Sequence, residues 1–290
     1  MIKHAVVIPS KDRADVVGKY ADSPLNRFKD PVFNTHLWVN ASESDSYHEA
    51  LKKLDIRTVP LMPDEMSTNI AETREHILQW AHRNKYDWLF MVDDDVRFFE
   101  RSKNYSSLPV TVEDTKNMVN HLISICTPEH PLVSTRERFM INQVDHAYEK
   151  NAKIIRIYMI HVPTFIEQGI SFLYKGMKVF EDKLVQVLLN EKGYRTITSV
   201  HFAQSTRDSS NANGGCAEYR TNPETERCVD IFLKDFPKAF TETVKTGYKD
   251  GPVRYVKSTL KNYLNPGELK YVPSSEMESR LSDYRIQECN

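Results

Sequence analysis

The chain has 290 residues, of which 40% are hydrophobic and 27% are charged, a composition that suits a globular protein and excludes a long disordered segment. Its 39 basic and 40 acidic residues give a net charge of −1, which excludes a histone-like polycation but leaves room for a local basic face. The longest clean apolar run, Trp88 to Val92, is far shorter than the roughly 20 residues of a membrane helix.

The N-terminus, the cysteines and the glycines exclude further classes of protein. Met1 leads into a short apolar run and then into polar residues, which is not the layout of a signal peptide. The four cysteines contain no CxxC pair, so we expect reduced thiols in a cytoplasmic protein rather than a thiolate zinc site. Only 9 glycines are present, with no G-x-G-x-x-G or P-loop pattern, which disfavours a Rossmann dinucleotide site or a Walker phosphate site.

Strand and helix patterns alternate over the first hundred residues. Four short apolar runs predict buried strands, at Ala5–Ile8, Thr35–Val39, Ile56–Val59 and Trp88–Val92. Apolar residues at helical spacing predict a helix between Ser67 and Asn84, with Ser67 or Thr68 as its N-cap. This alternation is typical of a parallel sheet with crossover helices.

Three adjacent aspartates, Asp93, Asp94 and Asp95, follow the fourth predicted strand directly. Neighbouring carboxylates repel one another, and each raises the free-energy cost of ionising the next. A hard cation such as Mg²⁺ or Mn²⁺ relieves this repulsion, and the carboxyl ends of strands are where α/β sheets bind ligands. The alternative is a solvated acidic turn. A buried strand that ends in three aspartates is not typical of a surface loop, so the sequence favours a metal site.

The second half of the chain is less regular. Further elements are predicted by the same patterns, as helices at Val112–Cys126, Val179–Tyr194 and Arg227–Leu233 and as strands at Ile154–Val162 and Thr196–Phe202. Thr111 is the expected N-cap of the first of these helices. Ser205–Asn213 is polar and predicts a loop. No repeat is visible, so we expect a single domain with a C-terminal extension from about residue 236.

Three patches, in the right order along the chain, resemble the GT-A glycosyltransferases. Ile8-Pro9-Ser10-Lys11-Asp12-Arg13 is similar to the opening of that fold, Asn69–Arg74 to the helix before its metal strand, and Leu89–Asp95 to its DxD motif. The resemblance covers about residues 4 to 99. It implies a Rossmann-like mixed α/β sheet flanked by helices, a nucleotide-sugar donor, and Mn²⁺ or Mg²⁺ as the cofactor.

The resemblance also implies roles for individual residues. The base and ribose of the donor would be held after the first and second strands, by Pro9, Ser10, Arg13, Asn40 and Glu43. Arg74 would lie near the pyrophosphate, Asp93 or Asp94 would face the ribose, and Asp95 would bind the cation together with Asp93. Without the resemblance, surface salt bridges explain the two arginines equally well, and a turn explains Asn40.

Two later positions match the same family. Glu181-Asp182 resembles the ED motif of inverting GT-A enzymes, in which a carboxylate takes the proton of the acceptor hydroxyl. The alternative is that acidic residues simply favour the first turn of a helix. His201 stands where the family has a third metal ligand, although a lone histidine is more often structural.

A glycine-containing segment, Ser210–Thr221, precedes the last predicted helix. Gly214 and Gly215 permit a close backbone approach to a ligand, and with Tyr219 and Arg220 they would shape the pocket for the sugar diphosphate or the acceptor. A plain turn is the alternative. These residues and the Glu-Asp pair resemble a narrower group, the bacteriophage glycosyltransferases that modify hydroxymethylated DNA bases, some called TET-associated glycosyltransferases.

A local basic stretch is compatible with a DNA acceptor. Between Val244 and Tyr271 there are six basic residues, among them Lys257 and Lys261, against two acidic ones, with four interleaved tyrosines. Lysines can contact phosphates, and tyrosines can stack on an extruded base. The alternative is a basic helix whose tyrosines pack on the core and whose lysines are solvated.

The sequence therefore predicts a metal-dependent transferase that moves a sugar from a UDP-sugar to hydroxymethylcytosine in phage DNA, with no membrane partner. Residues 1–235 would form the GT-A domain and residues 236–290 a basic, tyrosine-rich helical extension. Three alternatives stay open: a glycan or protein acceptor, a sugar nucleotidyltransferase, and a non-catalytic nucleic-acid-binding or sugar-binding protein. The nucleotidyltransferase would need a glycine-rich first loop, and Pro9–Arg13 has no glycine.

Overall fold

The structure, a computed structural model, describes residues 3–52, 57–62, 68–102, 106–143, 148–206, 219–246 and 251–260. Residues 57–62 and 141–143 are described by their backbone. Gly214, Gly215 and Lys261, three of the predicted acceptor-binding residues, lie outside the described residues.

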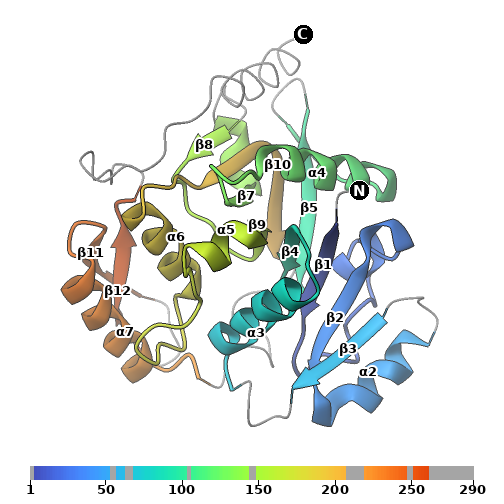
Figure 1. The fold of residues 1–290 in the computed structure, drawn as a ribbon, viewed down its shortest axis with the longest axis horizontal. Coiled ribbons are helices and arrows are strands. Elements are labelled where there is room, and N and C mark those ends of the chain that lie inside the picture. Colours follow the sequence, from blue (N-terminus) through green and yellow to red (C-terminus); the bar gives the residue numbers. More distant parts are fainter. Residues whose placement is uncertain are drawn as a thin grey trace.

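The first half of the chain forms a parallel sheet (Figure 1). β1 (His4–Pro9) lies between β2 (Thr35–Asn40) and β4 (Trp88–Val92), and β3 (Arg57–Met62) lies outside β2. All three pairings are parallel. β1 and β4 are apolar and almost entirely buried, as strands covered by helices on both faces must be. The four predicted strands are confirmed.

The strands after β4 extend this sheet, and some of them run antiparallel to their neighbours. Beyond β4 the order is β9 (Ile157–His161), β7 (Leu132–Glu137), β10 (Ile197–Thr206), β5 (Val96–Arg101) and β6 (Ser107–Pro109), and β8 (Tyr148–Lys150) pairs with β10. β9 is antiparallel to both of its neighbours, and β5 is antiparallel to β10. Among the later strands, β7 and β10 pair in parallel and the other pairs are antiparallel. The mixed sheet expected from the resemblance is confirmed.

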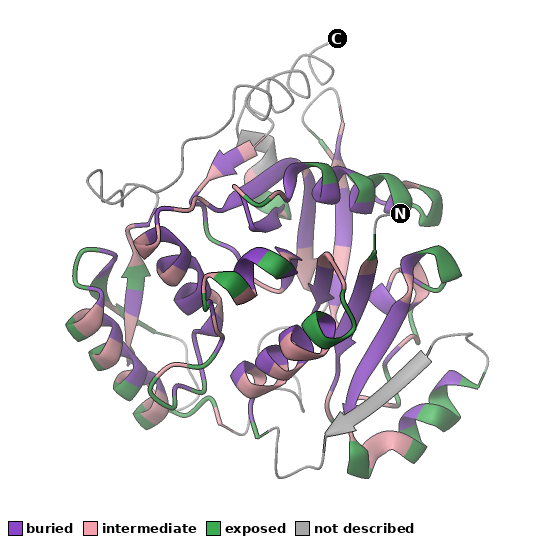
Figure 2. Cartoon of the chain, viewed as in Figure 1, coloured by how far each residue is buried: buried purple, intermediate pink, exposed green. Residues whose placement is uncertain are grey.

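Helices cover both faces of the sheet (Figures 1 and 2). One apolar core lies under α1 (Pro24–Arg27), α2 (Ser44–Leu51) and α4 (Val112–Ile125). The other lies under α3 (Ile70–Arg83), α5 (Val162–Glu167) and α6 (Glu181–Glu191). Short 3-10 turns add η1 (Pro31–Phe33), η2 (Ala41–Glu43) and η4 (Arg138–Gln143). Among the described helices, none has the length and apolar character needed to cross a membrane.

Polar residues set the beginnings of α3 and α4. Thr111 caps α4 in a capping box with Asp114, as predicted. The cap of α3 is Asn69, whose side chain accepts a hydrogen bond from the Glu72 backbone. Of the two predicted caps, Ser67 lies outside the described residues, and Thr68 instead donates from its backbone N–H to the Glu72 carboxylate. The helix therefore begins one residue later than Thr68 would allow.

The C-terminal part of the described chain is a helix and a hairpin, not a helical extension. α7 (Asn222–Asp235) is followed by the antiparallel pair β11 (Phe240–Lys245) and β12 (Val253–Ser258). The expectation of a helix was wrong here because β11 contains two threonines and a valine and β12 contains two valines and a tyrosine, residues that favour extended backbone. Figure 1 shows this unit at the side of the molecule, beyond α6. A third apolar core joins α6, α7 and the hairpin.

Candidate active site

The carboxyl ends of β1, β2 and β4 meet at one edge of the sheet. Ser10, directly after β1, donates its backbone N–H to the carbonyl of Trp38 in β2 at 2.9 Å. β4 pairs with β1 on the other side and delivers Asp93, Asp94 and Asp95 to the same edge. The parallel register therefore brings together residues that lie more than 80 positions apart in the sequence.

Asp94 is the buried anchor of this edge. Its side chain is 7% exposed and accepts hydrogen bonds from Ser10 Oγ and from Arg13 Nη1, each at 2.5 Å. Burial raises the pKa of Asp94, and the opposing effects of Arg13 and Ser10 are smaller. Asp94 therefore fastens the loop after β1 to the end of β4 and is not available to contact a ribose. Of the two predicted ribose contacts, Asp93 has the more exposed side chain, at 29% against 7% for Asp94.

Asp93 and Asp95 flank this anchor and keep part of their carboxylates accessible, with side chains 29% and 26% exposed. Burial, followed by the charges of Asp93 and Asp94, raises the pKa of Asp95 to about 6. Arg13 Nη1 stands 3.4 Å from Asp95 Oδ2 and opposes this rise. Two partly accessible carboxylates close together fit a divalent cation whose other ligands are phosphate oxygens and water. The described residues contain no group of three acidic, histidine or cysteine side chains arranged around a cation.

Arg74, from the middle of α3, connects the aspartates to a distant carboxylate. Its Nη2 donates to Asp93 Oδ1 at 2.7 Å, and its Nη1 donates to Glu181 Oε1 and to the Tyr158 hydroxyl. The guanidinium carbon lies 4.3 Å from the centre of the Tyr158 ring. The surface-salt-bridge interpretation of Arg74 is wrong, because its side chain is only 4% exposed.

Glu181 and Asp182 occupy the first turn of α6 but have different surroundings. Glu181 is buried and ion-paired with Arg74, and burial raises its pKa. Asp182 is half-buried and accepts a hydrogen bond from the backbone N–H of Lys183 at 2.8 Å. Neither carboxylate caps the helix with its side chain, because Phe180 occupies the cap position with a φ of 69°. Of the pair, Asp182 is the more exposed side chain.

The residues expected to bind the nucleoside lie around the same edge. Glu43 accepts a hydrogen bond from the Asp12 backbone at 2.6 Å, which ties the end of β2 to the loop that holds Arg13. Pro9 is the buried last residue of β1, and Asn40 ends β2 without capping η2 through its side chain. The structure therefore places these candidates at or just after the ends of β1 and β2, and Ser10 and Arg13 are the ones that contact the aspartates directly.

Three contributors to the site were missed by sequence reasoning. Tyr47 is fully buried, and its hydroxyl contacts Ser10 Oγ at 2.8 Å and accepts from the Arg13 backbone at 3.1 Å. Arg156 accepts a hydrogen bond from the Asp93 N–H through its backbone carbonyl, and its charge lowers the pKa of Asp95. Tyr158 supports Arg74. No local motif marks these residues, because each reaches the site through strand or helix packing.

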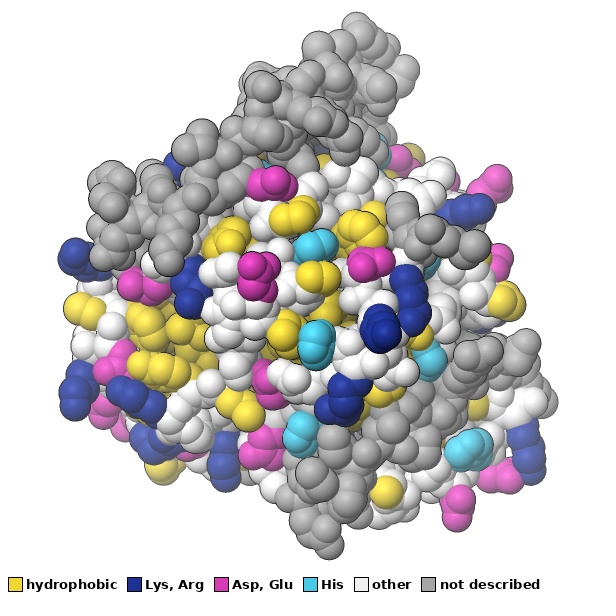
Figure 3. All heavy atoms as spheres, viewed as in Figure 1, with side chains coloured by type: hydrophobic (Ala, Val, Ile, Leu, Met, Phe, Trp, Pro, Cys, Tyr) yellow, Lys and Arg dark blue, Asp and Glu magenta, His cyan; other side chains and the backbone are white. Residues whose placement is uncertain are grey.

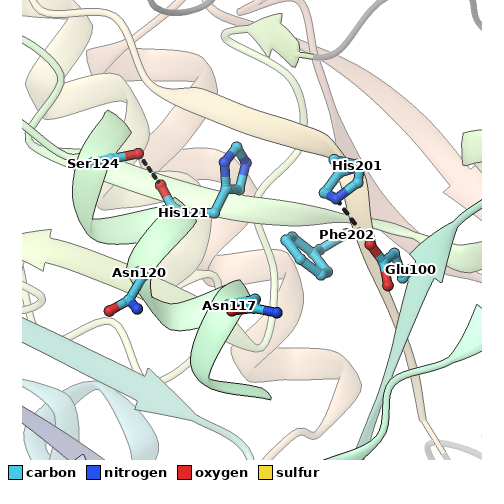
Figure 4. Close-up of a pocket in the computed structure, with 7 residues that line it drawn as sticks. All are labelled: Glu100, Asn117, Asn120, His121, Ser124, His201 and Phe202. Carbon is cyan, nitrogen blue, oxygen red and sulfur yellow. Dashed lines mark hydrogen bonds and ion pairs between the residues drawn. The ribbon is translucent and has the colours of Figure 1, made fainter. Parts of the chain in front are cut away.

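His201 does not join the aspartates, so its expected role as the third metal ligand is not supported. Val96, which follows Asp95 directly, aligns with Thr206 in the pairing of β5 with β10. His201 stands five residues earlier in β10, farther from the aspartates along the strand. Its Nε2 lies 3.1 Å from Glu100 Oε1. Figure 4 shows His201 and Glu100 pointing toward each other in a separate pocket of about 460 Å³, which is lined by Glu100, Asn117, Asn120, His121, Ser124, His201 and Phe202. The register of β10 decides this location, and the sequence does not reveal it.

The acceptor-binding candidates that the structure describes lie on the α6 side of the site. Tyr219 accepts a hydrogen bond from the backbone N–H of Ile70 at 2.9 Å, at the start of α3. The positive charge of Arg220 lowers the pKa of Glu181. Lys257 is exposed on β12, where it aligns with Thr241. Tyr219 and Arg220 therefore neighbour α3 and α6, the two helices that supply Arg74 and the acidic pair.

Comparison with known proteins identifies the fold. No protein-family model matches the chain, and no curated protein matches its sequence. Among solved structures, glucosyl-3-phosphoglycerate synthase from Mycobacterium tuberculosis, in complex with Mn²⁺, UDP and glucosyl-3-phosphoglycerate, matches with a TM-score of 0.50. The match covers 89% of this chain and 88% of that one, at 10% identity. A shared GT-A-like fold follows from this similarity.

Two weaker likenesses are to a structure described as mannose-1-phosphate geranyltransferase from Thermus thermophilus and to mouse xyloside xylosyltransferase 1. The first has a TM-score of 0.42 and 10% identity, over 70% of this chain and 76% of the other. The second has a TM-score of 0.34 and 8% identity, over 68% of this chain and 78% of the other.

Proposed function

We propose that this protein is a metal-dependent glycosyltransferase that moves a sugar from a nucleoside diphosphate sugar, best a UDP-sugar, to a hydroxyl acceptor. The observation that carries the proposal is the acidic edge of the sheet, where Asp93 and Asp95 flank the buried Asp94. A solvated acidic turn would not bury Asp94 under Arg13 and Ser10. The M. tuberculosis synthase of the same fold is described with Mn²⁺ and UDP bound, which supports this choice of donor and cofactor.

The donor would lie across the ends of β1, β2 and β4. Asp93 and Asp95 would hold Mn²⁺ or Mg²⁺, and a cation bound there stabilises the negative charge that develops on the departing diphosphate. Pro9, Ser10, Asn40 and Glu43 would surround the nucleoside. Arg13 holds Asp94 and Asp95 in place, and Arg74 orients Asp93.

Asp182 would act as the general base. In an inverting displacement, the acceptor oxygen forms a bond to the anomeric carbon while the bond from that carbon to the phosphate oxygen breaks. The hydroxyl proton moves to the Asp182 carboxylate. Glu181 is less suited to this step because it is buried and paired with Arg74. Its contribution would be to hold Arg74 beside Asp93.

Calorimetric titration with UDP, with and without Mn²⁺, tests the donor site. We expect UDP to bind only when Mn²⁺ is present, and we expect Asp95→Asn to lose this binding. The exposed Asp45→Asn is the matched control and should bind like the wild type. UDP binding without metal, or a preference for a nucleoside triphosphate, would contradict the proposal, and the second result would indicate a nucleotidyltransferase.

The finer proposal for the acceptor is hydroxymethylcytosine in DNA. Figure 3 shows basic and acidic side chains interspersed on the face that it draws, so DNA binding would depend on local contacts. Mass spectrometry of hydroxymethylcytosine-containing duplex after incubation with a panel of nucleotide sugars is the test. We expect a mass gain with one donor and its loss in Asp182→Asn. Transfer to a glycan or protein, with no gain on DNA for any donor, would reject this acceptor.

A further inference from the structure

Two lysines from separate segments, Lys183 and Lys245, meet at the ring of Tyr255 near the start of α6. Two further basic residues, Lys153 and Arg220, act electrostatically on Lys245. Lys183 lies in the first turn of the helix, Lys153 between β8 and β9, Lys245 at the end of β11, and Arg220 just before α7. The Lys245 side chain is exposed overall, and partial burial is the largest cause that lowers its pKa. The positive charges of Lys183, Lys153 and Arg220 lower it further. Lys153 also pairs with Glu137 at 3.7 Å. We refer to these four residues as the basic cluster.

Lys183 is the unusual member of the basic cluster. The residue is only 7% exposed. Burial lowers the pKa of Lys183, and the negative charge of Asp182 opposes this effect. Its Nζ lies 5.5 Å from the centre of the Tyr255 ring and 6.0 Å from that of Phe180. A buried ammonium group is costly unless an anion pairs with it, and a contact with an aromatic face offsets only part of that cost.

Lys245 brings a second positive charge to the same ring. Its Nζ stands 3.6 Å from the centre of Tyr255. Lys245 and Tyr255 share one face of the hairpin, because Lys245 aligns with Val253 and Tyr255 lies two residues farther along β12. Two ammonium groups that share one aromatic partner repel each other, and an anion between them would remove that repulsion.

The basic cluster adjoins the proposed general base. Lys183 follows Asp182 in the chain, and the charge of Asp182 acts on both Lys183 and Lys245. Glu181, on the other side of Asp182, is linked through Arg74 to Asp93. An anion held by the cluster would therefore stand beside the base and at a different position from the donor phosphates, which belong at Asp93 and Asp95.

We propose that the basic cluster binds a phosphate group of the acceptor and thereby positions the acceptor hydroxyl beside Asp182. The inference rests on the proposed glycosyltransferase function and names the recognition element of its acceptor. A phosphate presents several oxygens to several cations at once, which matches ammonium groups and a guanidinium arriving from different segments. The phosphate could be a diester of a DNA backbone or a phosphate ester on a small acceptor, and the test distinguishes the two.

The test compares Lys183→Met and Lys245→Met with the wild-type full chain in the presence of UDP and Mn²⁺. Methionine keeps most of the side-chain volume and removes the charge. The exposed Lys116→Met on α4 is the matched control. The two probes are a short hydroxymethylcytosine-containing duplex, measured by fluorescence anisotropy at several salt concentrations, and inorganic phosphate, measured by the shift in Tm.

For a DNA acceptor, we expect each lysine variant to weaken duplex binding about tenfold. The slope of the logarithm of the binding constant against the logarithm of the salt concentration should fall in magnitude by about one. For a small phosphorylated acceptor, we expect inorganic phosphate to raise the Tm of the wild type but not of the variants, and the duplex to bind weakly to all forms. In both cases the affinity for UDP with Mn²⁺ and the behaviour of Lys116→Met should be unchanged.

The proposal is overturned if the wild type binds neither probe, or if both lysine variants bind the probes like the wild type. Lys183→Arg keeps the charge and should retain binding, which separates loss of charge from loss of folding. If Lys183→Met does not fold, the exposed Lys245→Met decides the outcome. Absence of UDP binding in the wild type would instead count against the donor site, because the phosphate probe reports on the cluster independently.

Discussion

At the scale of single residues, Arg74 is the connection on which the site depends. One guanidinium bonds to Asp93 and Glu181 and lies over the ring of Tyr158. Its planar guanidinium presents Nη1 and Nη2 to the two carboxylates in a fixed geometry, whereas a lysine ammonium group is a single point charge on a flexible chain. Because Glu181 is buried as well, removal of either partner leaves the other as an unpaired buried charge, which destabilises the fold.

Arg74→Gln should therefore lower the free energy of unfolding by about 3–5 kcal/mol, because it leaves the buried Glu181 carboxylate uncompensated. Urea unfolding measures the change. The control is Arg97→Gln, whose ion pair with Asp22 at 2.7 Å is partly exposed and should contribute less than about 1 kcal/mol. A cost for Arg74→Gln as small as that of the control would contradict the role assigned to this residue.

In the absence of metal, removal of the Asp95 charge should stabilise the fold, whereas removal of the Arg74 charge destabilises it. Its pKa rises from 3.8 to about 6 on folding, so the folded state binds the proton more tightly than the unfolded state. The associated stability is fully present below pH 3.8 and is lost as the pH rises through 6. At pH 8, Asp95→Asn should therefore raise the free energy of unfolding by about 1–2 kcal/mol, a figure reduced to allow for the partly exposed side chain.

Urea unfolding in EDTA at pH 8 and at pH 4 measures this difference, which should shrink at the lower pH. The same variant should lose metal-dependent UDP binding. A variant that is less stable than the wild type at pH 8 would show that Asp95 has a structural role instead.

At the scale of elements, the helices that carry the site begin in different ways. α3 and α4 have side-chain caps, Asn69 and Thr111, which satisfy backbone N–H groups. α6 begins at Phe180 in the left-handed region, without a side-chain cap. Glu181 and Asp182, in the first turn, therefore do not cap the helix with their side chains, and Glu181 pairs with Arg74.

Asn69→Ala and Thr111→Ala should each lower the free energy of unfolding by about 1 kcal/mol, since each removes one N-cap. Their effects on the donor should differ, because α3 carries Arg74 and α4 carries no proposed site residue. We expect Asn69→Ala to weaken UDP binding with Mn²⁺ and Thr111→Ala to leave it unchanged. Equal effects of the two variants on calorimetric UDP binding would refute this link between the cap and the site.

At the scale of the whole molecule, the end of the described chain packs into the body of the protein. Phe240, Val256 and Leu260 are buried in the core that also contains Leu184 of α6 and Phe232 of α7. The Phe232 and Phe240 ring centres are 4.5 Å apart. The hairpin therefore supports α6 from the side opposite to the sheet.

A chain that ends at residue 235 should consequently be less stable than one that ends at residue 260. Loss of the hairpin exposes several side chains, each contributing about 1.5–3 kcal/mol of burial, so we expect a drop of about 5 kcal/mol in the free energy of unfolding. Urea unfolding of the two chains measures it. Equal stability of the two would instead favour the predicted domain boundary between residues 235 and 236.

The parts of the site that lie close together in the chain could be predicted from the sequence. The Asp93–Asp95 cluster follows a strand that its apolar run made evident, and the acidic pair Glu181-Asp182 stands at a helix start. Contacts between residues that are distant in the sequence were harder to predict. Arg74 and Glu181 are separated by 107 positions, and nothing local to either predicts that they pair. The position of His201 beside Glu100 depends on the register between β10 and β5.

The sequence by itself determined the alternating strands and helices of the first half, the cap of α4 and the acidic end of β4, because local periodicity and burial specify them. Only the tertiary structure decided the mixed directions of the later strands, the hairpin after α7, the pairing of Arg74 with Glu181 and the gathering of the basic cluster. These features arise when distant segments pack together, and the free energy of that packing depends on partners that no local pattern contains.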